Sequence, residues 1–230
     1  MKKTVLITGA SGGLGKATVL KFINEGFKVI ATVTPGKSLG FKVEEGIIEY
    51  EADLTNEESV DSVIKEIISG HPTIDAALLL VGGFAPGNIK STDGTALKRM
   101  FAVNFDTAYF VARPVFDHML TQSKGGRLIF VGSRPALQPK DGKNSVAYSL
   151  SKSLIFKLAD ILNAEGASKN VTASVIVPST IDTEANRKAM PDNDFGTWVK
   201  PEEIAEAMAF LCSERGMSLR ETVMKIYGRA

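Results

Sequence analysis

The 230-residue sequence has little of several features that would place it in a particular class of protein. Its one cysteine, Cys212, excludes an internal disulfide and fits a reducing compartment; its apolar neighbours indicate a buried residue rather than a reactive thiol. The 27 basic and 26 acidic residues nearly cancel, so no nucleic-acid footprint is expected. No apolar run approaches the ~20 residues that cross a bilayer, and no signal peptide is recognised. We therefore expect a soluble cytoplasmic protein with no metal site and no nucleic-acid or membrane partner.

The sequence does contain a regular alternation of strand-like and helix-like segments. Helical patterns lie at about 14–23, 56–68, 94–120, 146–165 and 202–213. Apolar strand candidates lie at Thr4–Ile7, Lys28–Val33, Ile47–Tyr50, Ala76–Val81, Arg127–Val131, Val171–Val177 and Thr222–Tyr227. This alternation predicts one α/β domain over residues 1–230, with a doubly wound (Rossmann-type) parallel sheet of about seven strands and helices on both faces. The longest irregular stretches, 134–145 and 178–200, follow the carboxyl ends of strands, where such sheets bind ligands.

A glycine-rich turn follows the first strand directly. Residues 8–15 read Thr-Gly-Ala-Ser-Gly-Gly-Leu-Gly and lead into the first helical pattern. Backbone N–H groups and a helix N-terminus attract a pyrophosphate, and glycine lets the backbone approach it closely. The alternative is a tight strand-to-helix connection without a ligand. The first interpretation predicts cofactor contacts from Gly9, Ser11, Gly13, Leu14 and Gly15.

A second signal is the pair Tyr148 and Lys152. Four residues apart on a helix, the two side chains lie on one face. A neighbouring ammonium lowers the pKa of a phenol, which is ordinarily near ~10. The pair could then pass a proton to a carbonyl oxygen near neutral pH. Taken alone, the same spacing also fits an exposed pair of no chemical importance.

With the glycine turn at its start and this pair past its middle, the chain resembles the short-chain dehydrogenase/reductase family over essentially its whole length. The family's catalytic serine ends the strand before the Tyr-Lys helix, and Ser133 stands there. Its catalytic asparagine, in a Val-Asn pair, matches Asn104. Individually, Ser133 could be a turn cap and Asn104 an ordinary polar helix residue; the four matches occur in the family's order.

The resemblance implies hydride transfer between a nicotinamide cofactor and C=O or C=N. Tyr148 would supply the proton, and Ser133 would hold the oxygen or nitrogen that accepts it. Lys152 would lower the pKa of the tyrosine and bind the nicotinamide ribose, and Asn104 would hold a water that links Lys152 to solvent. The further cofactor contacts that the resemblance implies are Asp53 and Leu54 beside the adenine, Gly82 and Gly83 after the fourth strand, and Pro178, Ile181 and Thr183 near the carboxamide.

Two departures from the family pattern bear on the cofactor. The family's Asn-Asn-Ala-Gly is replaced by Leu79–Gly82, which keeps only the glycine. The acidic residue that ends strand two in NAD-dependent relatives is replaced by Val33. No carboxylate then opposes a 2′-phosphate, which Thr34, Lys37 or Lys42 could approach. The cofactor is expected to be NADP in preference to NAD.

A narrower resemblance points to a substrate. Residues 80–85 and 182–198 are similar to segments of dihydropteridine reductases, although those enzymes lack the serine that stands here at 133. The resemblance implies that Ser133, Tyr148, Phe84, Met190 and Trp198 contact substrate and that a lid covers about 179–200. A lid of the kind found in any related reductase explains the second segment equally well.

The sequence therefore predicts an NAD(P)(H)-dependent oxidoreductase for a carbonyl, alcohol or quinonoid pterin-like small molecule. The alternative is a catalytically silent NAD(P)-sensing regulator, which would not need the proton-transferring residues. A mononucleotide-binding kinase would need a hydroxyl after Lys16, where Ala17 stands. A homodimer or homotetramer is expected through helices 94–120 and 146–165, because their apolar faces include Leu154, Ile155, Leu158 and Ile161.

Overall fold

The computed structural model describes residues 2–40 and 46–229, which form a parallel sheet of seven strands. The sheet order is β3-β2-β1-β4-β5-β6-β7. The strands are β1 (Thr4–Thr8), β2 (Lys28–Val33), β3 (Ile47–Glu51), β4 (Ala76–Leu79), β5 (Gly126–Val131), β6 (Val171–Pro178) and β7 (Val223–Ile226). The chain starts in the middle of the sheet, builds one edge, crosses back and builds the other, as a doubly wound sheet does. The predicted fold class is confirmed.

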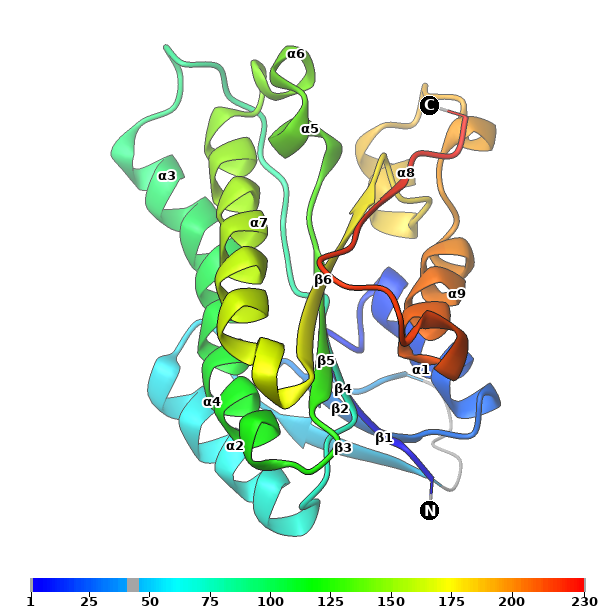
Figure 1. Ribbon diagram of the computed structural model, residues 1–230. Coiled ribbons are helices and arrows are strands. Elements are labelled where there is room, and N and C mark those ends of the chain that lie inside the picture. The colour runs from blue at the N-terminus through cyan, green and yellow to red at the C-terminus, as the bar shows by residue number, and fades with distance from the viewer. Residues whose placement is uncertain (1, 41–45, 230) are drawn as a thin grey trace.

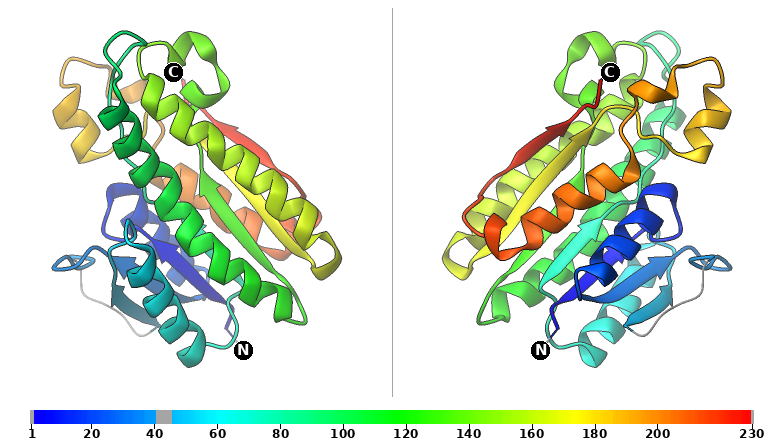
Figure 2. Two further views of the ribbon diagram at one scale, coloured as in Figure 1. Left: turned by 90° about the vertical axis from the view of Figure 1, so that its left-hand side faces the viewer. Right: turned by 90° about the vertical axis from the view of Figure 1, so that its right-hand side faces the viewer.

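Helices cover both faces of the sheet (Figures 1 and 2). On one face lie α2 (Glu57–Gly70), α4 (Thr107–Thr121) and α7 (Val146–Gly166); on the other lie α1 (Gly13–Asn24) and α9 (Pro201–Cys212). Successive residues of β1 point to opposite faces, so Leu6 joins the core under α2, α4 and α7, while Val5 and Ile7 join the core under α1 and α9. Two apolar layers therefore hold the strand ends in fixed positions.

Local sequence signals set the helix ends. The Asn56 side chain accepts a hydrogen bond from the Ser59 N–H (3.0 Å) and starts α2, with two acidic residues in the first turn. Pro201 is the first residue of α9. Gly26, just after α1, has a φ of +80°, which glycine adopts without strain. Within residues 2–40 and 46–229 no membrane-spanning helix is found, since each helix falls short in length or apolar character.

The two stretches predicted to be irregular contain short helices. Residues 134–145 form α5 (Arg134–Leu137) and α6 (Pro139–Gly142), and 178–200 contain α8 (Glu184–Ala189) and a 3₁₀ turn, Phe195–Thr197. The prolines of 134–145 fall in the first turn of α5 and of α6, where a missing N–H costs nothing. All of these segments gather above the carboxyl ends of the strands (Figure 1).

The helix predicted over 94–120 is also not a single α-helix. α3 (Gly94–Phe101) passes into a π-helical turn, Ala102–Asp106, before α4 begins. Single π turns of this kind occur at functional sites. Here the turn contains Asn104, whose side chain is buried and bonded to a loop outside the helix.

At the start of β6, a side chain takes the place of a neighbouring strand, because β7 begins further along. β7 pairs with β6 only from Val175 onward. Before that point, the buried Asn163 of α7 donates to the Ala173 carbonyl oxygen and accepts from the Ala173 N–H, both at 2.8 Å. The amide therefore satisfies backbone groups that a neighbouring strand would otherwise have to meet.

Candidate active site

The glycine turn forms a cradle that no side chain could enter. A Cβ on Gly15 would stand 2.1 Å from the Gly9 carbonyl oxygen and 2.7 Å from the Ala10 Cα. Gly9 itself has a φ of +65°. Ser11 is half-exposed on the turn, but the Leu14 side chain is buried in the core, so only its backbone could meet a ligand. The N-terminus of α1 opens onto this cradle, an arrangement that fits a pyrophosphate.

The segment after β6 lies against the same turn. A Cβ on Gly13 would be 2.8 Å from the Thr183 methyl, so Thr183 packs directly on the glycine turn. The Thr183 hydroxyl accepts from the Asn186 N–H (3.2 Å) and caps α8. Pro178 ends β6, and Ile181 forms a parallel bridge with Val199. Of the residues expected on the nicotinamide side, Thr183 is thus brought to the glycine turn.

The loop after β2 lies where the adenosine end is expected. Val33 is buried, while Thr34 and Lys37 are exposed; Lys42 lies outside the described residues. Asp53 follows β3, and hydrogen bonds from Thr55 lower the pKa of its carboxyl. Leu54 is buried beside it.

Sequence reasoning missed a carboxylate at this loop. Glu51, the last residue of β3, accepts a hydrogen bond from the Gly36 N–H at 3.1 Å. The contact joins the ends of two strands that are neighbours only in the folded sheet, so no local motif marks it. Glu49 acts similarly on the Leu39 N–H (3.1 Å). The two carboxylates hold residues 36–39 against β3.

Ser133 carries an unused hydroxyl at the end of β5. It is 3% exposed, and its Oγ has no hydrogen-bond partner among the described residues. Although it precedes α5, its side chain makes no capping bond. A buried polar atom without a partner is costly, and this one is free to bind a substrate atom.

The Tyr148 side chain is half-buried beside Ser133. Burial raises the pKa of Tyr148, and the nearby Ser133 hydroxyl acts in the opposite direction without forming a hydrogen bond within 3.5 Å. Loss of hydration is the largest influence on this pKa, so the lowering of the Tyr148 pKa by Lys152 stays a prediction. The phenol is held in its protonated form at neutral pH.

Lys152 is the most unusual ionisable group of the site. Its side chain is 4% exposed, and Nζ donates to the Val131 carbonyl oxygen at 2.8 Å. Burial lowers the pKa of Lys152 to about 8. A Cβ on Gly82 would be 3.0 Å from this Nζ, so the Gly82 backbone passes directly against the amino group. Only glycine fits there.

Asn104 fastens the turn that carries Gly82. It is fully buried; its Oδ1 accepts from the Gly83 N–H (2.9 Å) and its Nδ2 donates to the Gly83 carbonyl oxygen (3.0 Å). Nδ2 also donates to the Ser151 hydroxyl (3.1 Å). The side-chain oxygen and nitrogen of Asn104 are therefore both bonded to protein groups. The water that was predicted to link Asn104 with Lys152 would have to bind the Asn104 main chain instead.

The residues expected to contact substrate have different surroundings. Phe84 is 64% exposed and meets the Tyr148 ring edge-on, with centroids 5.0 Å apart. Met190 is half-exposed at the end of α8. Trp198 is buried and packs on Phe195 at 4.8 Å, so it supports the base of the lid segment rather than lining the site. Phe84 alone of the three contacts the proposed proton donor.

The buried lysine makes stability depend on pH. Replacing it with an isosteric apolar side chain, Lys152→Met, is expected to stabilise the protein at pH 7 by about 1–3 kcal/mol. The folded state holds the Lys152 proton more weakly than the unfolded state, whose pKa is 10.5. The cost is full below pH 8 and disappears as the pH rises toward 10.5.

Denaturant unfolding of both proteins between pH 7 and 10.5 checks this expectation. The stability difference should shrink across the window, while Lys157→Met, an exposed substitution on the same helix, should show no such trend. A Lys152→Met protein less stable than wild type at pH 7 would contradict it.

Comparison with known proteins agrees with this geometry. The family model described as "short chain dehydrogenase" matches residues 3–194. The chain is 28% identical to acetoacetyl-CoA reductase from Acinetobacter sp. (strain RA3849) over 244 residues, covering 99% of this chain and 97% of the relative. It is 28% identical to dihydropteridine reductase from Dictyostelium discoideum over 214 residues, covering 90% and 87%. The solved structure of ElxO with NADP bound superposes with a TM-score of 0.90 at 25% identity, covering 99% and 98%.

The chain therefore belongs to the short chain dehydrogenase family. It is an NAD(P)-dependent oxidoreductase of that family.

Proposed function

We propose that this enzyme reduces a C=O or C=N group of a small molecule, with Tyr148 as the proton donor. The observation that carries the proposal is the buried, unpartnered hydroxyl of Ser133 beside the protonated Tyr148 phenol. Both groups lie at the edge of the sheet formed by the carboxyl ends of the strands. The glycine turn follows β1, in the middle of the same edge. The turn, in which a Cβ on Gly13 or Gly15 would clash with neighbouring protein atoms, fits a nicotinamide dinucleotide held by Gly9, Gly13 and Gly15.

The roles of the residues follow from their surroundings. When bound, the reduced cofactor supplies a hydride. As the substrate carbon gains that hydride, the electron pair of its double bond moves to the oxygen or nitrogen, which takes the phenolic proton of Tyr148. Ser133 donates a hydrogen bond to the same atom as negative charge develops on it. Lys152, one helical turn away, stabilises the tyrosinate that remains and binds the ribose.

We infer a preference for NADPH. The end of β2 presents Val33 and Thr34 instead of a carboxylate, and the exposed Lys37 lies three residues further on. ElxO, similar to this chain over nearly its whole length, has been solved with NADP bound. The Glu51 carboxylate is tied to the Gly36 N–H, which supports a role in shaping the loop rather than in binding ribose.

A substrate screen tests the function. Cofactor oxidation is followed across ketones, β-ketoacyl thioesters, aldehydes and quinonoid dihydropterins, each with NADPH and with NADH. We expect turnover of at least one class and a higher kcat/KM with NADPH. Binding of either cofactor without turnover of any class would favour the silent regulator instead.

Ser133→Ala separates the two substrate classes. With a carbonyl substrate, losing the hydrogen-bond donor should lower kcat by about 10²-fold. With a quinonoid pterin, whose reductases resemble this chain but lack the serine, the loss should be only a few-fold. Steady-state kinetics on each accepted substrate, with Ser213→Ala at the half-exposed end of α9 as control, measures the difference. An unchanged kcat on every carbonyl substrate would contradict the role given to Ser133.

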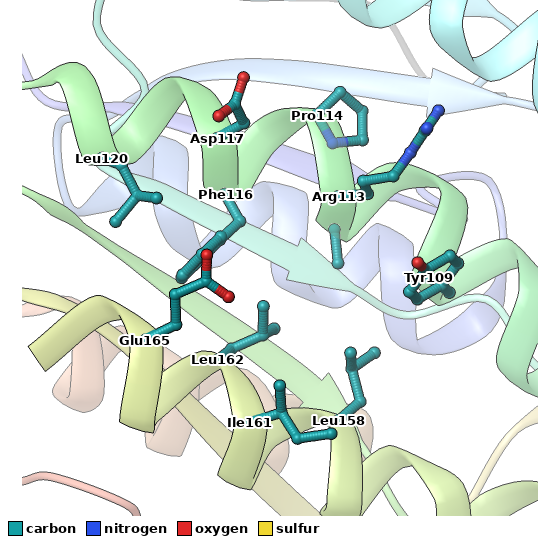
Figure 3. Close-up of a pocket in the computed structure, with 11 residues that line it drawn as sticks. Tyr109, Arg113, Pro114, Phe116, Asp117, Leu120, Leu158, Ile161, Leu162 and Glu165 are labelled. Atoms are coloured by element: carbon teal, nitrogen blue, oxygen red, sulfur yellow. The ribbon is translucent and has the colours of Figure 1, made fainter.

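We further propose that two copies associate through α4 and α7. A groove of about 480 Å³ runs between these helices, and Figure 3 shows its apolar side chains facing one another. Ile161, 54% exposed, lies in the groove, with Arg113, Asp117 and Glu165 at its rim. Charges of both signs on one rim can pair with those of a second copy related by a two-fold axis.

The apolar face is narrower than predicted from the sequence. Ile155 and Leu158 are 1% and 8% exposed and belong to the core, and Leu154 is half-buried. Ile161 is thus the principal side chain of this set left for a partner. Ile161→Glu is expected to convert a dimer to a monomer by burying like charges together, as light scattering at micromolar concentration would show. A monomeric wild-type protein would contradict the proposal.

A further inference from the structure

Ser151 lies on α7 between Tyr148 and Lys152 and is fully buried. Its hydroxyl donates to the Tyr148 carbonyl oxygen at 2.8 Å. Since a hydroxyl has a single proton, Ser151 can meet a second group only as an acceptor. The group it meets is the Asn104 Nδ2, at 3.1 Å.

This contact reinforces one orientation of the Asn104 amide, which the Gly83 backbone also favours. With Nδ2 toward Ser151, the amide also donates to the Gly83 carbonyl oxygen and accepts from the Gly83 N–H. In the flipped orientation, Oδ1 would face the lone pairs of both Ser151 and the Gly83 oxygen, and the amide N–H groups would face the Gly83 N–H. Each of these pairings is repulsive, and the site is buried, so the flipped form is strongly disfavoured.

The oriented amide in turn places the Gly82–Phe84 turn. The Gly82 backbone passes against Lys152 Nζ and Asn104 Oδ1: a Cβ there would be 3.0 and 2.9 Å from them. The next residues carry the turn to Phe84, whose ring meets Tyr148. A continuous set of bonds therefore leads from the helix carrying Tyr148 and Lys152, through Ser151 and Asn104, to the turn that closes over both.

We propose that Ser151 is a positioning residue for the reaction. Through the Asn104 amide it fixes the Gly82–Phe84 turn relative to the Tyr148 phenol and the Lys152 amino group. The inference rests on the proposed role of Tyr148 as proton donor. Neither Ser151 nor its bond to Asn104 is needed for any chemical step.

Ser151→Ala tests this, and Ser153→Ala is a matched control. Ser153 lies on the same helix and its hydroxyl makes the same bond to the carbonyl oxygen three residues back (Leu150, 2.7 Å), but it is half-exposed whereas Ser151 is fully buried. Ser151→Ala should lower kcat by about 10-fold or more, the scale of a misplacement approaching 1 Å, and shift the pH profile of kcat. Ser153→Ala should change neither.

Hydrogen exchange gives a readout that needs no substrate. In the free protein, Ser151→Ala should accelerate exchange of the Gly83 amide, because its acceptor, the Asn104 oxygen, loses its fixed orientation. Ser153→Ala should leave that amide protected. If Ser151→Ala does not fold, Ser151→Cys keeps the volume with a weak acceptor, and the same two changes are expected.

A double-mutant cycle with Asn104→Ala completes the test. Once Asn104 is absent, Ser151→Ala should lower kcat little further, whereas independent residues would give losses that multiply. A Ser151→Ala enzyme with wild-type kcat and wild-type protection at Gly83 would overturn the proposal. Tyr148→Phe in the same assay separates the two proposals. If Tyr148→Phe is inactive while Ser151→Ala behaves like the wild type, only the role of Ser151 is contradicted. If Tyr148→Phe is active, the proposed function itself is contradicted.

Discussion

Tyr148→Phe is expected to lower kcat by about 10²–10⁴-fold, the typical contribution of general acid catalysis. The substitution keeps the ring, and with it the edge-on contact to Phe84 at 5.0 Å, and removes only the hydroxyl. Cofactor affinity should stay near the wild-type value, because the cradle of Gly9, Gly13 and Gly15 is untouched. Stopped-flow turnover and a fluorescence titration with NADPH measure the two effects separately.

Tyr109→Phe is the control for this experiment. Tyr109 lies on α4 at the groove between α4 and α7, where its ring stacks on Phe105, so it loses the same hydroxyl away from the site. Its kcat should equal that of the wild type. If Tyr148→Phe turned over as fast as Tyr109→Phe on a substrate found in the screen, another group would have to supply the proton.

Gly15→Ala should abolish measurable NADPH binding at concentrations that saturate the wild type. The new methyl would stand 2.1 Å from the Gly9 carbonyl oxygen, so the turn must open for the chain to fold. Crowding against backbone is not relieved by a change of rotamer, and we expect the free energy of unfolding to fall by about 3 kcal/mol. Isothermal titration with NADPH and denaturant unfolding provide the measurements.

Gly94→Ala is the matched change without the clash. A Cβ at Gly94, the first residue of α3, would meet no atom within 4 Å. It should keep NADPH binding and leave stability unchanged or slightly higher, since alanine favours the helix. Equal NADPH affinity for Gly15→Ala and the wild type would show that the glycine turn is not the pyrophosphate site.

The features that sequence could predict are those encoded locally. The glycine turn and the apolar strands each occupy a few consecutive residues, and the structure contains them close to where they were expected. The doubly wound parallel sheet also follows from the alternation of segments, because right-handed crossovers leave few alternatives. Phe84 and Tyr148 lie 64 residues apart in sequence, and the family resemblance predicted that both lie at the site.

The features that could not be predicted depend on what surrounds a residue after folding. The direction of the Tyr148 pKa is set by burial of the phenol, which the spacing to Lys152 does not reveal. The Glu51 contact with Gly36 needs β2 and β3 side by side. The π turn lies where the interior amide of Asn104 binds a loop distant in sequence, a contact that helix propensity does not reveal. Trp198 was assigned to the substrate from the resemblance of its segment to dihydropteridine reductases, and in the structure its buried ring packs on Phe195.

The amide of Asn163 has a consequence beyond the folded monomer. The unpaired edge of a strand can capture a strand from another molecule, which is how many sheets begin to aggregate. The start of β6 is such an edge because β7 does not reach it, and Asn163 already occupies the N–H and carbonyl oxygen of Ala173 that an incoming strand would use. A single side chain on a neighbouring helix thus disfavours intermolecular strand addition at Ala173.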